Sequence, residues 1–452
     1  MLIILKKFYK IIMSKVPNFI LGPIFVLANE KNSSYNKVTE RMRYMREIAV
    51  IGGGASGLVA AITAARLGSR VTIFERQNRV GKKILVTGNG RCNMTNLNIK
   101  PEYFHTSSPR GCFTPIENKN VDVVLDFFNE LGIEPLVEKT KVYPASEQAS
   151  SVLDVMRMEV ERLGIIVKVE CKVIALEYKE RKWQVQVENG EKQLFDRIIV
   201  STGGMAAPNL GCDHSGYNLL KKLGHTEIET FPTIVHIISP TPYCKMMKGM
   251  RFKAEVSILV ENALKRVERG EVLFTEDGLS GPPIFLLSRV ASESFKNHKP
   301  CEIHFDLMPD WSKEDLVAKL YERLANGSHK SIEDLFVGWV NKRAILAVIK
   351  EADIGSPITP CENLDYEMIE RLAESMKCLV FKVEGTRGFK FAQATAGGIC
   401  IDEIDLQTMA SKKVPNLYVT GEVLDVDGDC GGYNLQWAWS TGLLAGESAA
   451  TV

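Results

Sequence analysis

The chain has 452 residues, of which 45% are apolar, and its 56 Lys and Arg nearly balance its 55 Asp and Glu. This length and composition predict two or three globular domains. The formal net charge of +1 gives no electrostatic reason to expect a nucleic-acid partner. The 10 Cys stand singly, without metal-ligand spacing, which favours free thiols in the reducing cytoplasm.

Residues 1–45 precede the first recognisable element. Lysines followed by the apolar run 18–28 give this segment a superficial resemblance to a signal peptide. The run is shorter than the roughly 20 residues that a membrane span requires, and Gly22 and Pro23 interrupt it. We therefore expect no membrane span here and interpret residues 1–45 as a disordered or adventitious N-terminal extension, with export as the alternative.

A dinucleotide-binding unit follows. An apolar strand over 48–51 leads into the pattern Gly-x-Gly-x-x-Gly, then a helix rich in small residues, and then a second strand that ends in an acid about 20 residues further on. The first glycine permits a tight turn, the second lets backbone approach a pyrophosphate, and the third lets helix and strand pack closely. The predicted cofactor contacts here are Gly52, Gly53, Gly54, Ala55, Ser56, Gly57 and Glu75, the last for a ribose diol.

A long basic loop rich in Gly and Asn comes next, where an ordinary NAD domain would begin another helix. Backbone donors and fixed positive charge suit a large anionic cofactor. The residues that we expect to contact it are Arg76, Lys82, Lys83, Gly88, Asn89, Gly90 and Asn93.

The middle of the chain alternates between helical and strand patterns. Helices are predicted over 121–131 and 151–163, and strands over 165–171, 172–178 and 183–187. A buried strand of the parallel type then runs over 197–202 and ends in the pair Gly203 and Gly204. The carboxyl edge of such a strand is where an open α/β sheet binds its ligand.

Residues 231–384 contain no nucleotide motif and form a predicted insertion between 46–230 and 385–452. We expect an antiparallel sheet or small barrel, followed by a helical cluster. The predicted elements are strands over 235–239, 254–261, 269–275 and 301–307, and helices over 313–325, 331–349 and 366–376. The wall of this insertion that faces the cofactor should supply the substrate pocket.

A second cofactor signal lies near the C-terminus, where a strand, a Gly/Asp loop and a helix that begins near Asn434 are predicted over 416–442. The N-terminus of that helix could stabilise negative charge on a reduced isoalloxazine, and Asp425 could bind the ribityl chain. NAD needs no such second site, whereas FAD is long enough to use both. Gly421, Gly432 and Leu435 complete the predicted contacts.

These motifs together resemble the bacterial BaiN-like (aminoacetone-oxidase-family) FAD-binding flavoproteins over about residues 46–450. The similarity rests on the two glycine motifs and on the blocks at 81–96, 142–149, 201–204, 273–282 and 395–399. It implies an α/β, glutathione-reductase-like Rossmann domain that binds FAD non-covalently, with inserted barrel-like and helical subdomains. It also implies that the backbone of Val173 contacts the adenine and that Thr202 and Gly203 close over the cofactor.

The expected activity is that of an FAD-dependent oxidoreductase that uses NAD(P)H to reduce a conjugated C=C bond of an apolar carbonyl compound. The resemblance supplies a 3-oxo bile-acid intermediate as the example. One alternative is an oxidase of a small amine or amino ketone, and another is a non-catalytic flavin sensor or RNA-associated protein. No second Gly-x-Gly-x-x-Gly occurs, so a pyridine nucleotide would have to enter the same cavity. Nothing in the sequence specifies an oligomeric state.

For a proton donor, the sequence offers Tyr143 and Tyr433 as weak candidates, because each lies in one of the motifs. A structural role is favoured for both. His214, His225 and His236 have no evident partner in the sequence and are interpreted as structural histidines. A redox role for Cys92 or Cys430 is less favoured than that of a reduced thiol.

Overall fold

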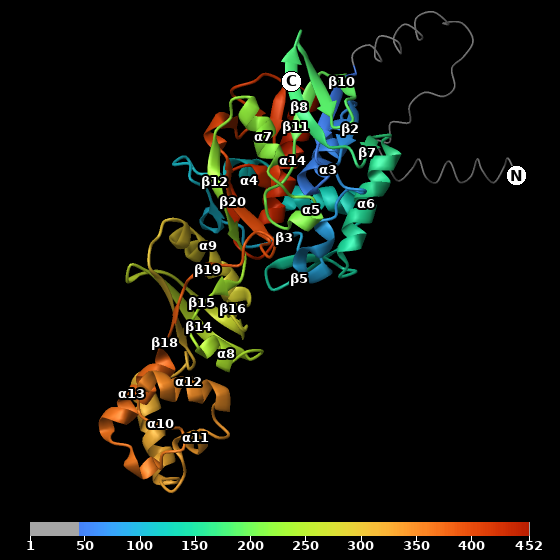
Figure 1. Ribbon diagram of the computed structural model, residues 1–452. Helices are drawn as coiled ribbons and strands as arrows, with labels where there is room; N and C mark the ends of the chain where they lie inside the picture. The colour runs from blue at the N-terminus through green and yellow to red at the C-terminus, as the bar shows by residue number, and fades with distance from the viewer. Residues whose placement is uncertain (1–44, 452) are drawn as a thin grey trace, which may run out of the picture. The chain divides into compact units, whose positions relative to one another are not determined.

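The computed structural model describes residues 45–451 of the chain, and residues 46–451 belong to one compact unit (Figure 1). The predictions for residues 1–44 lie outside the described residues. Residues 46–451 contain two seven-stranded sheets and a set of helices.

The first sheet has the strand order β21-β22-β23-β11-β1-β2-β7, and the five strands from β23 to β7 run parallel, whereas β21 and β22 are antiparallel to their neighbours. Its strands are β1 (Glu47–Ile51), β2 (Arg70–Phe74), β7 (Ile166–Lys168), β11 (Arg197–Val200), β21 (Ile404–Asp405), β22 (Ala410–Ser411) and β23 (Leu417–Val419). Strands β1 and β11 are apolar and almost wholly buried, as expected for a parallel sheet that is covered on both faces. The predicted Rossmann-like architecture is confirmed.

Two helices pack unusually closely beside this sheet. They are α3 (Ala55–Arg66) and α14 (Tyr433–Thr451). A Cβ atom on Gly442 would lie 2.6 Å from the carbonyl oxygen of Ser56, and one on Gly446 would lie 2.5 Å from that of Ala60. Glycine is therefore needed in α14 because the two helix backbones approach each other there.

Smaller elements surround the first sheet. The helices are α4 (Thr114–Asn118), α5 (Val121–Glu130), α6 (Ala149–Arg162) and α7 (Ser215–Lys222), with short helical turns η1 (Ile84–Gly90), η2 (Pro101–Tyr103), η3 (Pro208–Leu210), η5 (Ile401–Glu403) and η6 (Gly421–Val423). The strands are β3 (Thr95–Asn96), β4 (Phe104–His105), β5 (Pro135–Glu138), β6 (Lys141–Pro144), β8 (Val173–Lys179), β9 (Lys182–Val187), β10 (Lys192–Phe195), β12 (Glu227–Thr233), β20 (Ala394–Ile399) and β24 (Asp427–Gly428). These bear out the helices predicted over 121–131 and 151–163.

The second sheet is antiparallel throughout and has the order β18-β17-β14-β15-β16-β13-β19. Its strands are β13 (Ile237–Ile238), β14 (Arg251–Val260), β15 (Ala263–Phe274), β16 (Gly278–Ser280), β17 (Cys301–Asp306), β18 (Leu379–Lys382) and β19 (Gly385–Thr386), with α8 (Tyr243–Met246) and α9 (Pro282–Lys296) beside them.

The two edge strands of this sheet are halves of one segment. Between β18 and β19, the N–H of Val383 donates to the carbonyl oxygen of Cys301, and that of Glu384 donates to the carbonyl oxygen of Ile238. Residues 379–386 are therefore bonded to β17 on one side and to β13 on the other. This continuity closes the sheet on itself, and the barrel-like character predicted for the insertion is confirmed.

A helical subdomain lies between β17 and β18 in the chain. It contains α10 (Lys313–Ala325), α11 (Ile332–Leu335), α12 (Lys342–Ala352), the turn η4 (Cys361–Asn363) and α13 (Tyr366–Lys377). The single helix predicted over 331–349 is wrong, because the chain breaks at Gly338, whose φ is +80°. A new helix starts after Asn341, whose side chain accepts a hydrogen bond from the N–H of Arg343.

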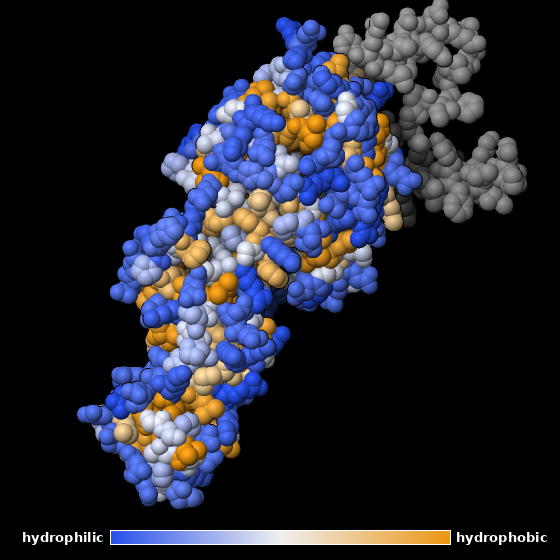
Figure 2. Space-filling view, viewed as in Figure 1, coloured by the Kyte–Doolittle hydropathy of each residue, from blue (hydrophilic) through white to orange (hydrophobic). Residues whose placement is uncertain are grey.

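Within residues 45–451, no helix is both long and apolar enough to cross a membrane. Figure 2 shows mainly hydrophilic residues on the visible face, with apolar residues in separate patches.

Buried ion pairs join the barrel-like insertion to the loop before α14. Arg266 of β15 binds Asp429 through two hydrogen bonds of 2.7 and 3.0 Å, and His105 lies 3.0 Å from the same carboxylate. Arg289 of α9 donates to both oxygens of Asp427, at 3.1 and 3.2 Å. Both aspartates are less than 10% exposed, so removal of either arginine would leave a buried charge without its main partner.

This arrangement predicts a specific pH dependence of stability. Burial raises the pKa of Asp427 to about 6, against the lowering effects of Arg289 and His105, and Asp425 raises it further. Between its unfolded pKa and about pH 6, the folded state holds a proton that the unfolded state has released. The free energy of unfolding should therefore fall as the pH rises through this window, by about 3 kcal/mol for two pKa units.

Urea unfolding of the wild type and of Asp427→Asn at several pH values between 4 and 7 checks this. The wild type should lose stability relative to the variant as the pH rises, whereas other titrating groups affect both proteins alike. Parallel stability curves would contradict the assignment.

Candidate functional site

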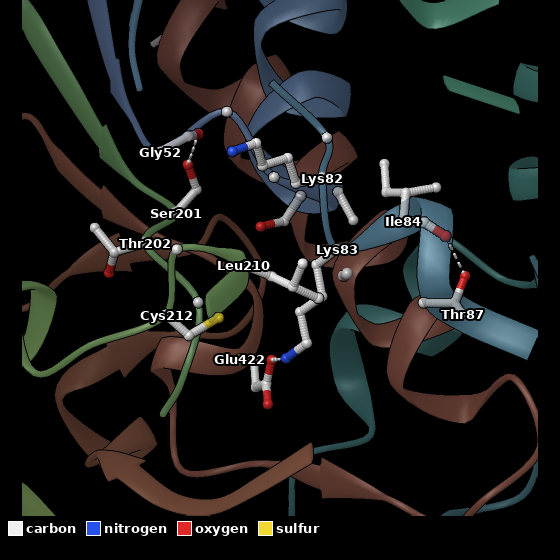
Figure 3. Close-up of a pocket in the computed structure, with 18 of the residues that line it drawn as sticks. Gly52, Lys82, Lys83, Ile84, Thr87, Ser201, Thr202, Leu210, Cys212 and Glu422 are labelled. Atoms are coloured by element: carbon white, nitrogen blue, oxygen red, sulfur yellow. Dashed lines mark hydrogen bonds and ion pairs between the residues drawn. The ribbon is translucent and has the colours of Figure 1, made fainter. Parts of the chain in front are cut away.

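A cavity of about 980 Å³ opens at the carboxyl edge of β1, β2 and β11, where an open α/β sheet binds its ligands (Figure 3). The β1–α3 turn, the end of β2, the basic loop, the turn after β11 and the start of α14 all contribute to it. Its lining includes Gly52, Gly53, Gly54, Ala55, Ser56, Glu75, Gln77, Lys82, Lys83, Ile84, Ser201, Thr202, Gly203, Leu210, Gly211, Cys212, Gln393, Glu422, Asn434, Leu435 and Trp437.

The glycines of the β1–α3 turn have the geometry that their motif predicts. Gly52 has a φ of +104°, and a Cβ there would lie 2.5 Å from the carbonyl oxygen of Ser201. A Cβ on Gly57 would collide with the carbonyl oxygen of Gly52. Around Gly54, by contrast, no atom lies within 4 Å of the position of a Cβ, because this residue faces the cavity. Bare backbone and the N-terminus of α3 thus meet whatever occupies the cavity.

Glu75, the acid at the end of β2, binds the backbone of this turn. One carboxylate oxygen of Glu75 accepts a hydrogen bond of 2.9 Å from the N–H of Gly53, and the other accepts one of 2.7 Å from the N–H of Gln77. Glu75 also lines the cavity. Its position suits a ribose diol beside the phosphate-binding turn.

A second cavity of about 420 Å³ adjoins the first and shares Gly52, Glu75, Thr202 and Gly211 with it. Val173 lines this second cavity, as does Arg76, which forms an ion pair with Asp213. Together the two cavities suit an elongated ligand that passes over the glycine turn. Thr202 lines both cavities, and its hydroxyl oxygen is buried on the side of Gly216, where a Cβ atom would lie 1.9 Å from it.

At the other end of the first cavity, Lys83 extends to Glu422 (Figure 3). The Lys83 ammonium donates a hydrogen bond of 2.7 Å to one carboxylate oxygen, and the N–H of Thr395 donates one of 2.9 Å to the other. Burial acts to lower the pKa of Lys83, but the charge of Glu422, its hydrogen bond and the nearby Cys212 together outweigh burial, and the pKa lies above its ordinary value. The two charges therefore compensate each other. We call the part of the cavity around Glu422, Asn434 and Leu435 the ring end.

Glu422 was missed by the sequence analysis, which assigned the ribityl contact to Asp425. The carboxylate of Asp425 instead accepts hydrogen bonds from the N–H and hydroxyl of Ser107, and the residue lines neither cavity. The sequence did contain a signal for Glu422, because this acid follows the buried strand β23 and Gly421 directly.

Several other predicted contacts lie outside both cavities. These residues are Gly57, Gly88, Asn89, Gly90, Asn93, Gly421 and Gly432. Three of them, Gly88 to Gly90, have positive φ and turn the basic loop, whereas a Cβ on Gly432 would meet the carbonyl group of Thr95. The glycines among these residues allow close packing or a positive φ at their positions.

Neither tyrosine candidate lines the cavities. The ring of Tyr143 packs under the guanidinium of Arg91, at 4.1 Å, and Tyr433 packs against Tyr103, with ring centroids 4.9 Å apart. These packing contacts accord with the structural role that was favoured for both tyrosines.

The three histidines that the sequence singled out have side-chain partners, and Cys92 is a buried thiol. His214 lies 2.6 Å from Glu227, His225 lies 3.1 Å from Glu403, and His236 lies 3.1 Å from Ser280. Burial raises the pKa of Cys92 to about 12, so its thiol is protonated at neutral pH.

The chain has recognisable relatives. The family model of the HI0933-like protein Rossmann domain matches residues 46–448. The chain is 34% identical to the 3-dehydro-bile acid delta(4,6)-reductase of Clostridium scindens, over 90% of this chain and 99% of that protein. It is 28% identical to the ribosomal RNA dihydrouridine synthase of Escherichia coli, over 87% of this chain and 95% of that one. A flavin-containing monooxygenase of Arabidopsis thaliana is 26% identical over 36% of each chain.

Fold, cavity and relatives define a flavoprotein of the Rossmann class, an FAD-dependent oxidoreductase. The chain belongs to the HI0933-like family.

Replacement of Gly54 by Val should abolish the retention of FAD without unfolding the protein. A side chain at this position would project into the cavity where the pyrophosphate is expected, and it would meet no protein atom. The FAD content of the purified variant and its thermal unfolding check this. Gly388→Val is the matched control, because a Cβ at Gly388 also meets nothing within 4 Å. A stoichiometric, yellow Gly54→Val protein would contradict the placement of the phosphates.

Proposed function

We propose that this oxidoreductase uses NAD(P)H to reduce a C=C bond conjugated to a carbonyl group in an apolar compound, and that its substrate is an oxidised steroid such as a 3-oxo bile-acid intermediate. The observation that carries this proposal is the 34% identity to the Clostridium scindens reductase over nearly the whole of both proteins.

The charges at the ring end support an uncharged substrate. Lys83 and Glu422 neutralise each other, and the neighbouring lining residues Ile84, Leu210 and Leu435 are apolar. A small amine or amino ketone would need a free opposite charge to hold it. For this reason we rank the amine-oxidase alternative below the reductase.

The residues present fit FAD, which supplies hydride exchange between a nicotinamide and the substrate when it is bound. The β1–α3 turn and Lys82 would hold the pyrophosphate, and Glu75 the ribose. Arg76 and Val173 line the part of the cavity that suits the adenine. Lys83 and Glu422 lie where the ribityl chain and the ring would run, and the N-terminus of α14 presents its positive dipole to that end.

The pyridine nucleotide would share this cavity. The chain has one Gly-x-Gly-x-x-Gly pattern, and FAD occupies it in this proposal. NAD(P)H and substrate would then bind in turn against the same ring. The cysteines of residues 45–451 have free thiols, which accords with the proposed cytoplasmic location.

A second candidate is the reduction of uridine in RNA, which the similarity to the Escherichia coli enzyme favours. The chemistry is closely related, because the 5,6 double bond of uracil is also conjugated to a carbonyl group. However, residues 231–384 contain 20 Lys and Arg against 23 Asp and Glu, so the insertion has no excess of positive charge for a phosphate backbone. We therefore place the steroid first.

An anaerobic titration of the purified, FAD-loaded protein tests the proposal. NADH or NADPH should bleach the flavin absorbance, and a 3-oxo steroid with a conjugated double bond should restore it, because the enone accepts the hydride. The corresponding saturated 3-oxo steroid, which has no conjugated double bond, is the control and should leave the flavin bleached.

Other results would separate the alternatives. Bleaching by an amino ketone but by neither nucleotide would favour the oxidase. Restoration by a uridine-containing RNA, but not by the enone, would favour the RNA enzyme.

A further inference from the structure

We propose that the side-chain amide of Gln393 binds the carbonyl oxygen of the substrate and stabilises the negative charge that develops there during reduction. This inference rests on the proposed function. Gln393 directly precedes β20, on the segment by which the chain returns from the insertion, and it lines the cavity.

Gln393 belongs to the ring end. Two residues further on, the N–H of Thr395 donates to Glu422, which defines that end of the cavity. Gln393 lines the first cavity but not the second, which lies beyond the glycine turn. A substrate that reacts at the flavin ring must occupy this region.

The other polar groups of the ring end are already engaged. Lys83 binds Glu422, and the indole N–H of Trp437 donates to the carbonyl oxygen of Gly421. Asn434 uses its amide oxygen to accept from the N–H of Gly428 at 2.9 Å, and its amide nitrogen to donate to the carbonyl oxygen of the same residue at 2.7 Å.

The Gln393 amide, by contrast, has no hydrogen-bond partner among residues 45–451, and the residue is exposed. Its two N–H donors are therefore available to a ligand. The Cys212 thiol, at the same end, is a weaker donor.

The backbone on both sides of Gln393 is held firmly. Its own N–H donates to the carbonyl oxygen of Ile234 at 3.2 Å. Ala392 is buried in a small cluster with Ala206 and Val235, and the hydroxyl oxygen of Thr395 accepts from the N–H groups of Met205 and Ala206. The backbone from which the amide extends is therefore fixed, and a bound carbonyl oxygen would fix the amide itself, which favours electrostatic stabilisation of a transition state.

A hydride from the two-electron-reduced cofactor forms a C–H bond at the β-carbon of the enone, and the C=C π bond breaks. Its electron pair moves through the α-carbon onto the carbonyl oxygen and gives an enolate. The Gln393 amide donates a hydrogen bond to this oxygen and transfers no proton. Solvent supplies the proton that the α-carbon finally takes up.

Stopped-flow reoxidation of the NAD(P)H-reduced protein by a 3-oxo-Δ4 steroid tests the role of Gln393. Loss of one such donor should slow reoxidation about 100-fold in Gln393→Ala. Gln393→Glu keeps the size but replaces the donor by a carboxylate, and it should be slower still. FAD content should stay at the wild-type value in both variants, and only fully reduced protein is mixed with the steroid, so that a change in NAD(P)H binding does not enter the measured rate. Gln193→Ala, on β10, is the matched control.

A second readout does not depend on turnover. The C=O stretching frequency of the steroid bound to the oxidised protein should be lower than in an apolar solvent, because a donated hydrogen bond weakens the bond. In Gln393→Ala the frequency should return toward the solvent value.

The outcomes separate this inference from the function on which it rests. If the wild type turns over the enone and Gln393→Ala does so at the same rate with an unshifted frequency, the role of Gln393 is overturned and the proposed function stands. If no enone binds to the wild type or reoxidises it, the proposed function fails and the role of Gln393 fails with it.

Discussion

The close approach of backbone at the turn between β1 and α3 is the constraint on which the rest of the structure depends. Gly52 and Gly57 bring the turn against the end of β11, and Gly442 and Gly446 bring α14 against α3. These contacts place the N-termini of two helices at one cavity. A Cβ atom at any of the four glycines would force the backbones apart, and the phosphate-binding and ring ends of the site would separate.

The loop before α14 connects the cavity with the insertion. It runs from Glu422, at the ring end, through three buried aspartates to Asn434, which again lines the cavity. Two of those aspartates are bound by Arg266 and Arg289 of the barrel-like insertion. Because buried ion pairs of this kind are strongly directional, the position of the insertion is tied to the wall of the ring end.

Charge compensation decides what the ring end can accept. A lysine and a glutamate that face each other leave little net field, so a neutral substrate loses less on entry than an ion would. Within this neutral region a single amide with unused donors provides direction without charge. Such a site can orient a carbonyl group while apolar walls receive the remainder of the molecule.

The sequence by itself determined the local features of this protein. Patterns within a few residues predicted the dinucleotide unit, with its strand, glycine turn, helix and acid. They also predicted the bounds of α10 and the start of α14 near Asn434. The barrel-like insertion followed from alternation and from the family resemblance. The break at Gly338 was missed because helical periodicity continues across it.

Only the tertiary structure decided which side chains meet at the cavity. Asp425 and Glu422 lie three residues apart on one loop, and the two residues differ in function because Ser107, more than 300 positions away, binds one of them and Lys83 binds the other. Tyr143 and Tyr433 lie in conspicuous motifs yet pack away from the site, whereas Gln393 lies beside the insertion, where the sequence shows no motif. The physical reason is that a side chain's chemistry depends on partners from distant segments, and these meet only when the chain folds.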